Sequence, residues 1–262
     1  MQNEQTIKFS HSRHEHPSQN AFFKHIHEDY ELLYFMEGDA EYVVESAVYR
    51  LQKGDLLLIK PGDYHFLRLL SQNPYERFVV NFSSSDFPPF IDEFLCSADV
   101  LYALPKESLV HSLFLEWKEK EKEKAFTREQ TLFLVRNILG YVLSVLPTAK
   151  KAESVQPTPL HDTLQEVLAF LEREPTTRLT VSELAEKFFV SPSWIAHTFK
   201  KELGISLSQY VGKKRMLYAK KLIQGGHTPT QAANECHFLE YSTFYRQYKK
   251  HLGVSPKQDA KR

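Results

Sequence analysis

The sequence predicts a multidomain α+β protein with an N-terminal β-barrel or sandwich, a helical hairpin and a C-terminal all-α domain. Short apolar runs separated by turn signals fill about residues 22–104, which is typical of an all-β domain. After Pro105 the apolar spacing becomes helical. Charge is divided as well: residues 160–262 hold 16 Lys and Arg against 10 Asp and Glu, leaving 17 basic and 23 acidic residues in 1–159.

The overall composition excludes several classes of protein. The 262 residues are 25% charged and 42% hydrophobic with no formal net charge, as in globular proteins of one or two domains. Cys96 and Cys236 fit neither a disulfide scaffold nor a zinc motif. We find no signal-peptide core and no apolar stretch of the ~18 residues that cross a bilayer. We therefore expect a cytoplasmic protein without a membrane partner.

Residues 1–105 are assigned to the β domain. We expect 1–20 to be an arm or a ragged first strand, because they are polar and rich in histidine. The clearest strands are 30–36, 40–44, 55–59 and 77–82, and Gly-Asp pairs mark the turns between some of them.

Residues 106–146 are predicted to form a helical hairpin, with helices at 106–124 and 128–146. Thr127 and Gln130 have capping-box spacing at the start of the second helix. This helix has two apolar stripes, one of which is spaced 3, 4, 3, 4 like a coiled-coil seam. Either both stripes are buried within the domain, or one packs on the barrel and the other on a partner chain, making a homodimer. The seam residues are Leu132, Val135, Leu139, Val142 and Leu146, and the second stripe is Leu134, Ile138, Tyr141 and Val145.

Residues 147–159 lack apolar periodicity and contain three prolines, which favours an extended linker. Everything from 160 to 262 has helical patterning. Within it, residues 181–204 resemble 229–253: Ala185 aligns with Ala233, and Gly204 aligns with Gly253. Each segment has the pattern of a short helix, a tight turn and a second helix.

The segment between the repeats, 206–224, is expected to be one linker helix. A helix of 19 residues is about 28 Å long at ~1.5 Å per residue. It could hold two reading helices roughly one turn of DNA apart, which is ~34 Å.

The second helix of each repeat is expected to bury one apolar face, formed by Ile195 and Phe199 in the first and by Phe244 and Tyr248 in the second. The opposite faces carry matching polar residues. A helix in the major groove needs hydrogen-bonding side chains for base edges and lysines for phosphates. One wet cationic face is ordinary, but two matched faces favour binding to double-stranded DNA. The candidate DNA-binding residues are Ser193, Trp194, His197, Lys200, Lys201, Ser242, Thr243, Arg246, Lys249 and Lys250.

A second candidate site lies in the β domain, where His25, His27, Glu31 and Gly38 have the spacing His-x-His-x3-Glu-x6-Gly. Strand alternation would put the first three on one face, and His65 is a fourth candidate. These groups could hold a divalent metal, hydrogen-bond an organic ligand, or satisfy each other. Further ligand-binding candidates are Tyr34, Tyr42 and Arg77, because aromatic faces stack on sugars and a guanidinium holds carboxylate or phosphate.

Residues 160–257 resemble the DNA-binding domain of the AraC/XylS family of transcriptional regulators. The resemblance rests on the two repeats, on the endings Phe-Lys-Lys-Glu-Leu-Gly (199–204) and Tyr-Lys-Lys-His-Leu-Gly (248–253), and on Gly-Val-Ser-Pro at 253–256. His237 stands where the family usually has Gly, and the tail lacks the usual Tyr-Arg. Residues 20–100 resemble the cupin sensor domain of such regulators, although the second cupin motif is only partial. That resemblance implies a β jelly-roll barrel that binds a small effector without catalysis.

We therefore expect a transcription regulator with a cupin barrel (1–105), a dimerising hairpin (106–146), a linker (147–159) and a tandem helix-turn-helix domain (160–262). The resemblance implies a sugar or related metabolite as effector, RNA polymerase as a partner if the protein is an activator, and no required cofactor. A divalent metal in the barrel stays open. The alternative is a metal-dependent cupin oxygenase or isomerase with an appended helical domain. We find no phosphate loop or nucleophile elbow for other catalysis, and we expect no enzyme.

Overall fold

The structure is a computed structural model that describes residues 7–22, 25–45, 47–105, 107–148, 158–159 and 162–260. The chain forms two compact units, residues 1–158 and 159–262. Residues 149–157 of the expected linker lie outside the described residues.

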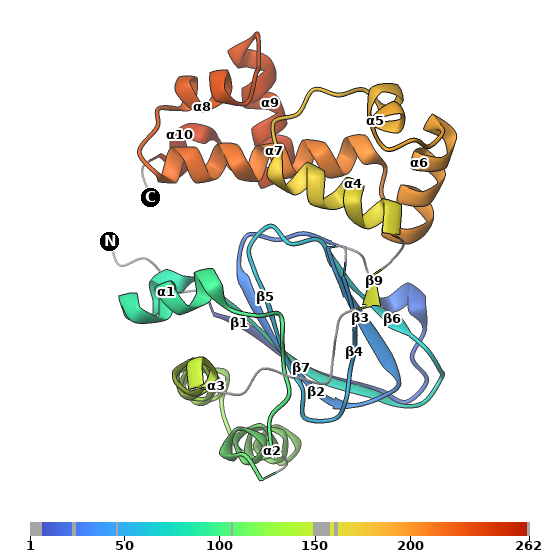
Figure 1. Cartoon of the computed structure of the whole chain (residues 1–262). Helices are drawn as coiled ribbons and strands as arrows, with labels where there is room; N and C mark the ends of the chain where they lie inside the picture. The colour runs from blue at the N-terminus through green and yellow to red at the C-terminus, as the bar shows by residue number, and fades with distance from the viewer. Residues whose placement is uncertain are drawn as a thin grey trace. The chain divides into compact units, whose positions relative to one another are not determined.

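The first unit contains a five-stranded sheet in the order β1-β7-β2-β5-β8 and a four-stranded sheet in the order β6-β3-β4-β9 (Figure 1). The described pairings are antiparallel, as expected for a β jelly roll. β1 pairs along its whole length with β7. For residues 8–14 this confirms the alternative of a first strand, and the alternative of an arm is wrong there. The strands are β1 (Lys8–His14), β2 (Tyr30–Glu37), β3 (Ala40–Val44), β4 (Ala47–Arg50), β5 (Leu56–Ile59), β6 (His65–Leu69), β7 (Tyr75–Phe82), β8 (Leu101–Tyr102) and β9 (Thr158–Pro159).

An inner core fills the space between the two sheets. Alternation along β2 directs Leu33 and Phe35 into it. The turn after β2 needs glycine, because Gly38 has φ 142° and a Cβ there would lie 2.9 Å from the Tyr75 ring. The other inner-core residues are Phe22, Ala40, Tyr42, Val44, Leu51, Leu57, Ile59, Leu67, Val79 and Leu101.

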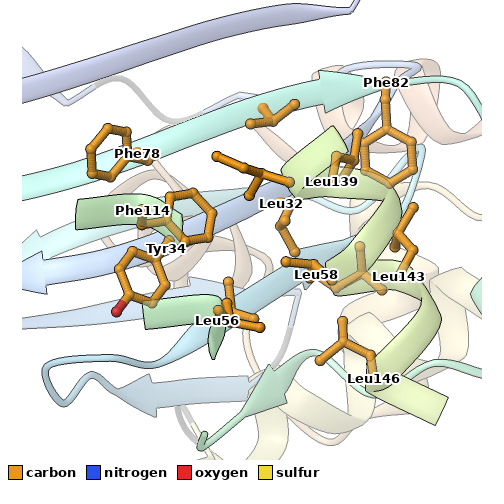
Figure 2. Close-up of a cluster of buried hydrophobic side chains, with 14 of the residues drawn as sticks. Leu32, Tyr34, Leu56, Leu58, Phe78, Phe82, Phe114, Leu139, Leu143 and Leu146 are labelled. Atoms are coloured by element: carbon orange, nitrogen blue, oxygen red, sulfur yellow. The ribbon is translucent and has the colours of Figure 1, made fainter. Parts of the chain in front are cut away.

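An outer core covers the opposite face of the five-stranded sheet, to which β2 contributes Leu32 and Tyr34. Figure 2 shows these side chains packed with Phe114 and Leu139. The covering helices are α1 (Pro89–Ser97), α2 (Leu109–Lys122) and α3 (Arg128–Val145). α1 lies within a stretch whose pattern predicts strands, so the prediction was wrong there. Its proline at the first helical position was a local signal for that helix.

The stripe of α3 spaced like a coiled-coil seam belongs to this outer core. Val135, Leu139 and Val142 are fully buried there, and Ile138 of the second stripe is buried too. The seam therefore packs on the chain's own sheet. Pairing of two chains through the other side of α3 stays a prediction. The predicted capping box of Thr127 with Gln130 is confirmed.

The described residues contain one helical segment long and apolar enough to cross a membrane, Arg128–Thr148, with a mean hydropathy of 1.4. This differs from the expectation that no apolar stretch is that long. Val135, Leu139 and Val142 of this segment pack on the β-sheet, which accounts for its apolar character within a folded core.

The second unit is all-α, and its longest helix, α7, carries one pair of helices at each end (Figure 1). α5 and α6 lie at one end, and α8 and α9 lie at the other. Met216, Ala219 and Ile223 of α7 form a core with Phe244 and Tyr248 of α9. The helices are α4 (Asp162–Arg173), α5 (Val181–Lys187), α6 (Pro192–Thr198), a π-helical turn (Phe199–Leu203), α7 (Leu207–Gln224), α8 (Pro229–Glu235), α9 (Tyr241–Leu252) and α10 (Pro256–Asp259).

The two helix pairs share their turn geometry. Phe189 and His237, 48 positions apart, both have left-handed backbone, with φ 55° and φ 58°. Gly204 and Gly253 end the second helices with φ 75° and φ 74°. His237 thus adopts the conformation that a glycine accommodates most easily, and Arg178 donates a hydrogen bond to its carbonyl oxygen. The departure at His237 leaves the second turn intact.

Candidate functional sites

The four candidate polar residues of the barrel meet in one cluster. One ligand atom from each of His25, His27, Glu31 and His65 lies within 4.8 Å of all the others. His27 Nε2 is 3.1 Å from Glu31 Oε2, and His65 Nε2 is 3.1 Å from His25 Nε2. His25 and His27 precede β2, so strand alternation does not align them. Instead, two backbone hydrogen bonds of 3.1 Å between His25 and His65 join the segment to β6.

Backbone carbonyls fix the orientation of two imidazoles. His27 Nδ1 lies 2.8 Å from the carbonyl oxygen of Asp29, and His65 Nδ1 lies 2.9 Å from that of Asp63. A carbonyl oxygen only accepts hydrogen bonds, so each Nδ1 carries a proton. In a neutral ring, Nε2 is then a lone-pair acceptor, and in both residues it faces the cluster.

Burial and partners set the charges of the cluster. Burial opposes the charge of Glu31, but His27 and His65 outweigh it and lower the pKa of Glu31 to about 2. Tyr42 Oη and Asn81 Nδ2 donate to the same carboxylate at 3.4 and 3.2 Å. Burial lowers the pKa of His65 to about 4. Burial also opposes the charge of His27, yet Glu31 raises its pKa overall. At neutral pH the site therefore has a carboxylate and an uncharged His65.

The cluster adjoins a cavity of about 320 Å³. Arg77 lines it, with its guanidinium 5.4 Å from the ring centre of Phe22 and 5.7 Å from that of Tyr75. Arg77 Nη1 donates a long hydrogen bond of 3.4 Å to Tyr75 Oη, while its buried Nε has no hydrogen-bond partner. The lining residues are Ala21, Phe22, His25, Tyr42, Leu67 and Arg77.

The structure separates Tyr34 from this cavity, which corrects its assignment as a ligand-binding residue. Tyr34 lies on the opposite face of β2 from Glu31, because side chains alternate along a strand, and it belongs to the outer core. Its ring stacks on Phe114 at 4.1 Å between centres, and its hydroxyl contacts His111. The odd separation of Glu31 and Tyr34 along β2 was a sufficient signal that they face opposite sides of the sheet.

Two residues of the barrel site, Phe22 and Asn81, were not predicted from the sequence. Asn81 lies on the same face of β7 as Arg77 and pairs directly with Glu31. The sequence shows that Asn81 and Arg77 share a face, but only the pairing of β2 with β7 shows that this face lies beside Glu31.

The helical unit presents the two matched faces expected from the sequence. In α6 and the following turn, Ile195 and Phe199 are buried, and in α9 Phe244 and Tyr248 are buried. Trp194 and Thr243 are half-buried at the same position of each face. The exposed members of the predicted set are Ser193, His197, Lys200, Lys201, Ser242, Arg246, Lys249 and Lys250.

The described contacts of these exposed residues are local. Arg246 Nη2 donates to Thr243 Oγ1 at 3.3 Å, and Lys200 Nζ donates to the carbonyl oxygen of Gly204 at 3.2 Å. Contacts on an exposed surface contribute little to stability, so these groups can exchange them for phosphates or base edges. Their contact with DNA stays a prediction.

Comparisons with known proteins agree with both parts of the chain. An AraC-like ligand binding domain model matches residues 11–99, and a helix-turn-helix domain model matches residues 184–262. The uncharacterized HTH-type transcriptional regulator YbfI of Bacillus subtilis is 26% identical over 225 residues, which cover 84% of this chain and 80% of that protein. The regulator YdiP of Escherichia coli, also named as uncharacterized, is 24% identical over 241 residues, covering 88% and 78%.

Among solved structures, ToxT from Vibrio cholerae is similar over 96% of this chain and 97% of its own, with 15% identity and a TM-score of 0.39. The matched family models and the curated relatives together account for the ligand-binding fold of the first unit and the helix-turn-helix units of the second. The chain belongs to the AraC family of DNA-binding transcriptional regulators and carries an N-terminal ligand-binding domain.

Proposed function

We propose that a small polar metabolite, such as a sugar or sugar derivative, binds in the barrel cavity and changes the affinity of the tandem helix-turn-helix domain for its DNA site. The observation that carries the proposal is the cluster of His25, His27, Glu31 and His65 beside a cavity lined by Tyr42 and Arg77. These groups offer hydrogen bonds, an aromatic face and a cation to one small ligand.

An effector can act only if it binds more tightly to one of two states of the regulator. Replacing a residue that binds the effector removes this difference in affinity and leaves residues 162–260 unchanged. His27→Ala should therefore abolish the effect of the metabolite on DNA binding while leaving DNA affinity without the metabolite unchanged. His16→Ala, an exposed histidine in the loop after β1, is the matched control and should respond like wild type.

The test is a footprint of the full chain on DNA flanking its own gene, repeated with a panel of sugars and sugar acids. A protected site whose occupancy changes with one of them supports the proposal. A footprint that no metabolite alters, or that His27→Ala leaves fully responsive, contradicts it.

We further propose that the protein is a homodimer that pairs through the exposed face of α3. Phe133 is 72% exposed, and with Phe126, Leu134 and Asn137 it lines a groove of about 460 Å³. Exposed apolar patches on soluble proteins mark interaction sites, and a second copy would bring two DNA-binding domains together. Phe133→Glu should convert dimers to monomers in light scattering, and an unchanged mass would place the interface elsewhere.

The proposed function places the protein in the cytoplasm, with DNA and, for an activator, RNA polymerase as partners. We propose no catalytic role for the barrel, because the relatives are transcription regulators. Turnover of a bound metabolite by the metal-loaded protein would instead support the alternative of a cupin enzyme.

A further inference from the structure

We infer that Arg178 and Arg215 are positioning residues for DNA recognition, which hold the second helix pair (α8 and α9) in place relative to the first pair (α5 and α6). They join the second pair to residues 174–180, the connecting segment between α4 and α5. In this way they set the spacing between the two stretches of DNA that α6 and α9 contact. This role goes beyond the proposed function, because it concerns the geometry of the DNA-binding domain and needs no metabolite.

The connecting segment is anchored on the first helix pair at both of its ends (Figure 1). It directly follows α4, in which Phe170 packs edge-to-face on Phe188 at the end of α5, with 5.8 Å between ring centres. At its other end, the Thr180 side chain caps α5 in a capping box with Glu183. The connecting segment is therefore part of the same packed group as α5.

Two arginine side chains join the connecting segment to the second helix pair. Arg178 donates a hydrogen bond to the carbonyl oxygen of His237, in the turn between α8 and α9. Arg215 of α7 donates to the carbonyl oxygen of Thr177 at 2.5 Å, and its guanidinium lies 5.9 Å from the ring centre of Phe238. The two arginines thus contact neighbouring residues of the segment and of the turn, and form one brace between them.

The brace is not an ion pair. Within the described residues, Arg178 and Arg215 form no salt bridge with a carboxylate, and the acceptors of their hydrogen bonds are backbone carbonyls. Burial lowers the pKa of Arg215, and the positive charge of Arg178 lowers it further, so two like charges are held near each other. Bonds to backbone carbonyls fix the path of the chain, which is what a positioning role requires.

The start of α9 depends on this brace more than the start of α6 does. At α6, the Ser191 side chain accepts a hydrogen bond from the backbone N–H of Trp194 at 3.1 Å, and Pro192 occupies the first helical position. These two local features fix the start of α6. The N-cap residue of α9 is Glu240, which makes no side-chain cap hydrogen bond. The bond from Arg178 to the turn before α9 supplies an anchor from outside that helix pair.

The length of α7 makes a second connection between the helix pairs important. Its 18 residues span about 27 Å at ~1.5 Å per residue. A change of about 10° in direction over that length displaces the far end by about 5 Å, which exceeds the ~3.4 Å between base pairs. Because long helices curve, α7 alone would set the spacing of α6 and α9 loosely. The brace removes this freedom.

The first test is a selection of binding sites by the full-length protein, without metabolite, from random duplexes about three turns (~30 base pairs) long. Wild type should enrich two short motifs at one fixed spacing. Arg178→Met and Arg215→Met should enrich the same two motifs at several spacings. Their preference for the wild-type spacing should fall about tenfold, as expected for loss of a hydrogen bond to a charged group.

Two further variants control for charge and for the donor group. Arg173→Met is the matched control, because Arg173 is an exposed arginine at the end of α4 that donates only to the carbonyl oxygen of Ala169 in its own helix among the described residues. It should keep the wild-type spacing. Arg178→Lys retains a positive charge and a donor, and should restore part of the preference that Arg178→Met loses.

The second test measures the geometry of the domain without DNA. Spin labels are attached at Glu186→Cys on α5 and Lys250→Cys on α9, both exposed positions, in a Cys96→Ser background that removes an exposed native cysteine. Labelled protein is diluted with unlabelled protein, so that distances within one chain are measured. The distance distribution should be narrow in the parent chain, broader with Arg178→Met and unchanged with Arg173→Met.

Wild-type protein that enriches no pair of motifs at one spacing would overturn the inference. So would an unchanged spacing preference, or an unchanged distance distribution, in Arg178→Met. A slope of log K against log salt that falls by about 0.9 in Arg178→Met at unchanged spacing would place Arg178 on a phosphate, which also overturns it. If Arg215→Met melts far below wild type, the exposed Arg178 decides the question.

Both tests are made without metabolite, which keeps this inference distinct from the proposed function. A strict spacing that depends on Arg178, in a protein whose DNA binding no metabolite alters, would contradict the proposed function alone. Metabolite-dependent DNA binding by a protein in which Arg178→Met leaves the spacing unchanged would contradict this inference alone.

Discussion

In the barrel, Glu31 and His65 are 4% and 0% exposed, and each contacts other members of the site. On α6 and α9, His197 and Arg246 are exposed. The barrel residues depend on packing and on one another for their positions, whereas the helix residues depend only on the helices that carry them. The difference teaches that substitutions in the first unit should act on stability and ligand binding together. Substitutions on the exposed faces of α6 and α9 should act on DNA binding alone.

The largest effect is expected in the outer core. Leu139→Ala removes a side chain with no exposed surface and should lower the free energy of unfolding by about 2–5 kcal/mol. Tyr141→Ala, on the exposed side of the same helix, should change it by less than about 0.5 kcal/mol. Chemical denaturation of the full chain measures both. A stable, monomeric Leu139→Ala protein derived from a dimeric wild type would instead place the seam in an interface between two chains.

The next effect concerns Glu76 on β7, a buried carboxylate on the barrel wall. It accepts hydrogen bonds from His11, Arg13 and Lys118 at 2.7–2.9 Å. Glu76→Gln should cost about 1–3 kcal/mol of stability at neutral pH, because the amide has no negative charge and replaces one of the two acceptor oxygens with a donor.

The same change should alter the pH dependence of stability. Burial opposes the charge of Glu76, but Lys118, His11 and Arg13 lower its pKa overall. Its contribution is thus complete above the unfolded value of about 4.3 and is lost as pH falls through the lower folded pKa. The difference in stability between wild type and Glu76→Gln should decrease as the pH falls, and melting curves from pH 7 to pH 3 would show it. A constant gap contradicts this role.

A loss of DNA-binding free energy of comparable size is expected on the exposed face of α9, without any change in the stability of the protein. Arg246→Ala should weaken binding to the cognate site by about 1–3 kcal/mol and relax the preference at one base pair, because an arginine can bond both acceptors of a guanine. His197→Ala, at the matching position of α6, should cost less. Binding to a library of single-base variants measures both. Equal affinity of Arg246→Ala and wild type for the cognate site would remove Arg246 from base recognition.

A smaller effect is expected for lysines that contact phosphate. Lys249→Ala should weaken binding to all sequences alike and reduce the slope of log K against log salt by about 0.9, since one fewer counterion is released. Lys201→Ala, which alters the matched helix pair of α5 and α6, should behave in the same way. A titration of affinity from low to high salt gives the slope. An unchanged slope with an altered base preference would reassign the lysine to base contact.

The smallest effect compares the two turns. Phe189 has left-handed backbone and is 96% exposed. Its conformation is therefore strained, and its ring buries almost no surface. Phe189→Gly should stabilise the protein by about 0.5–1 kcal/mol, the part of the ~1–2 kcal/mol strain that remains after the added flexibility of glycine. His237→Gly should have a similar effect by thermal melting. Destabilisation by Phe189→Gly would mean that the ring makes a contact in solution.

The sequence determined the main elements of this protein, because their causes are local. Capping residues, apolar spacing and turn residues located α3, α7 and the two helix-turn-helix units. The alignment of residues 181–204 with 229–253 placed the exposed and buried faces of α6 and α9 correctly, because spacing along a helix determines which residues share a face. The histidine spacing likewise singled out the cluster that the structure brings together.

The tertiary structure decided whatever depends on which surfaces meet. The apolar seam of α3 is the same whether a sheet or a second chain covers it, and only the fold shows Leu139 against the sheet. Tyr34 and Tyr42 are both buried strand tyrosines, yet the pairing of strands puts one in the outer core and the other beside the cavity. Periodicity states which residues share a face, whereas the long-range packing of sheets and helices determines what that face contacts.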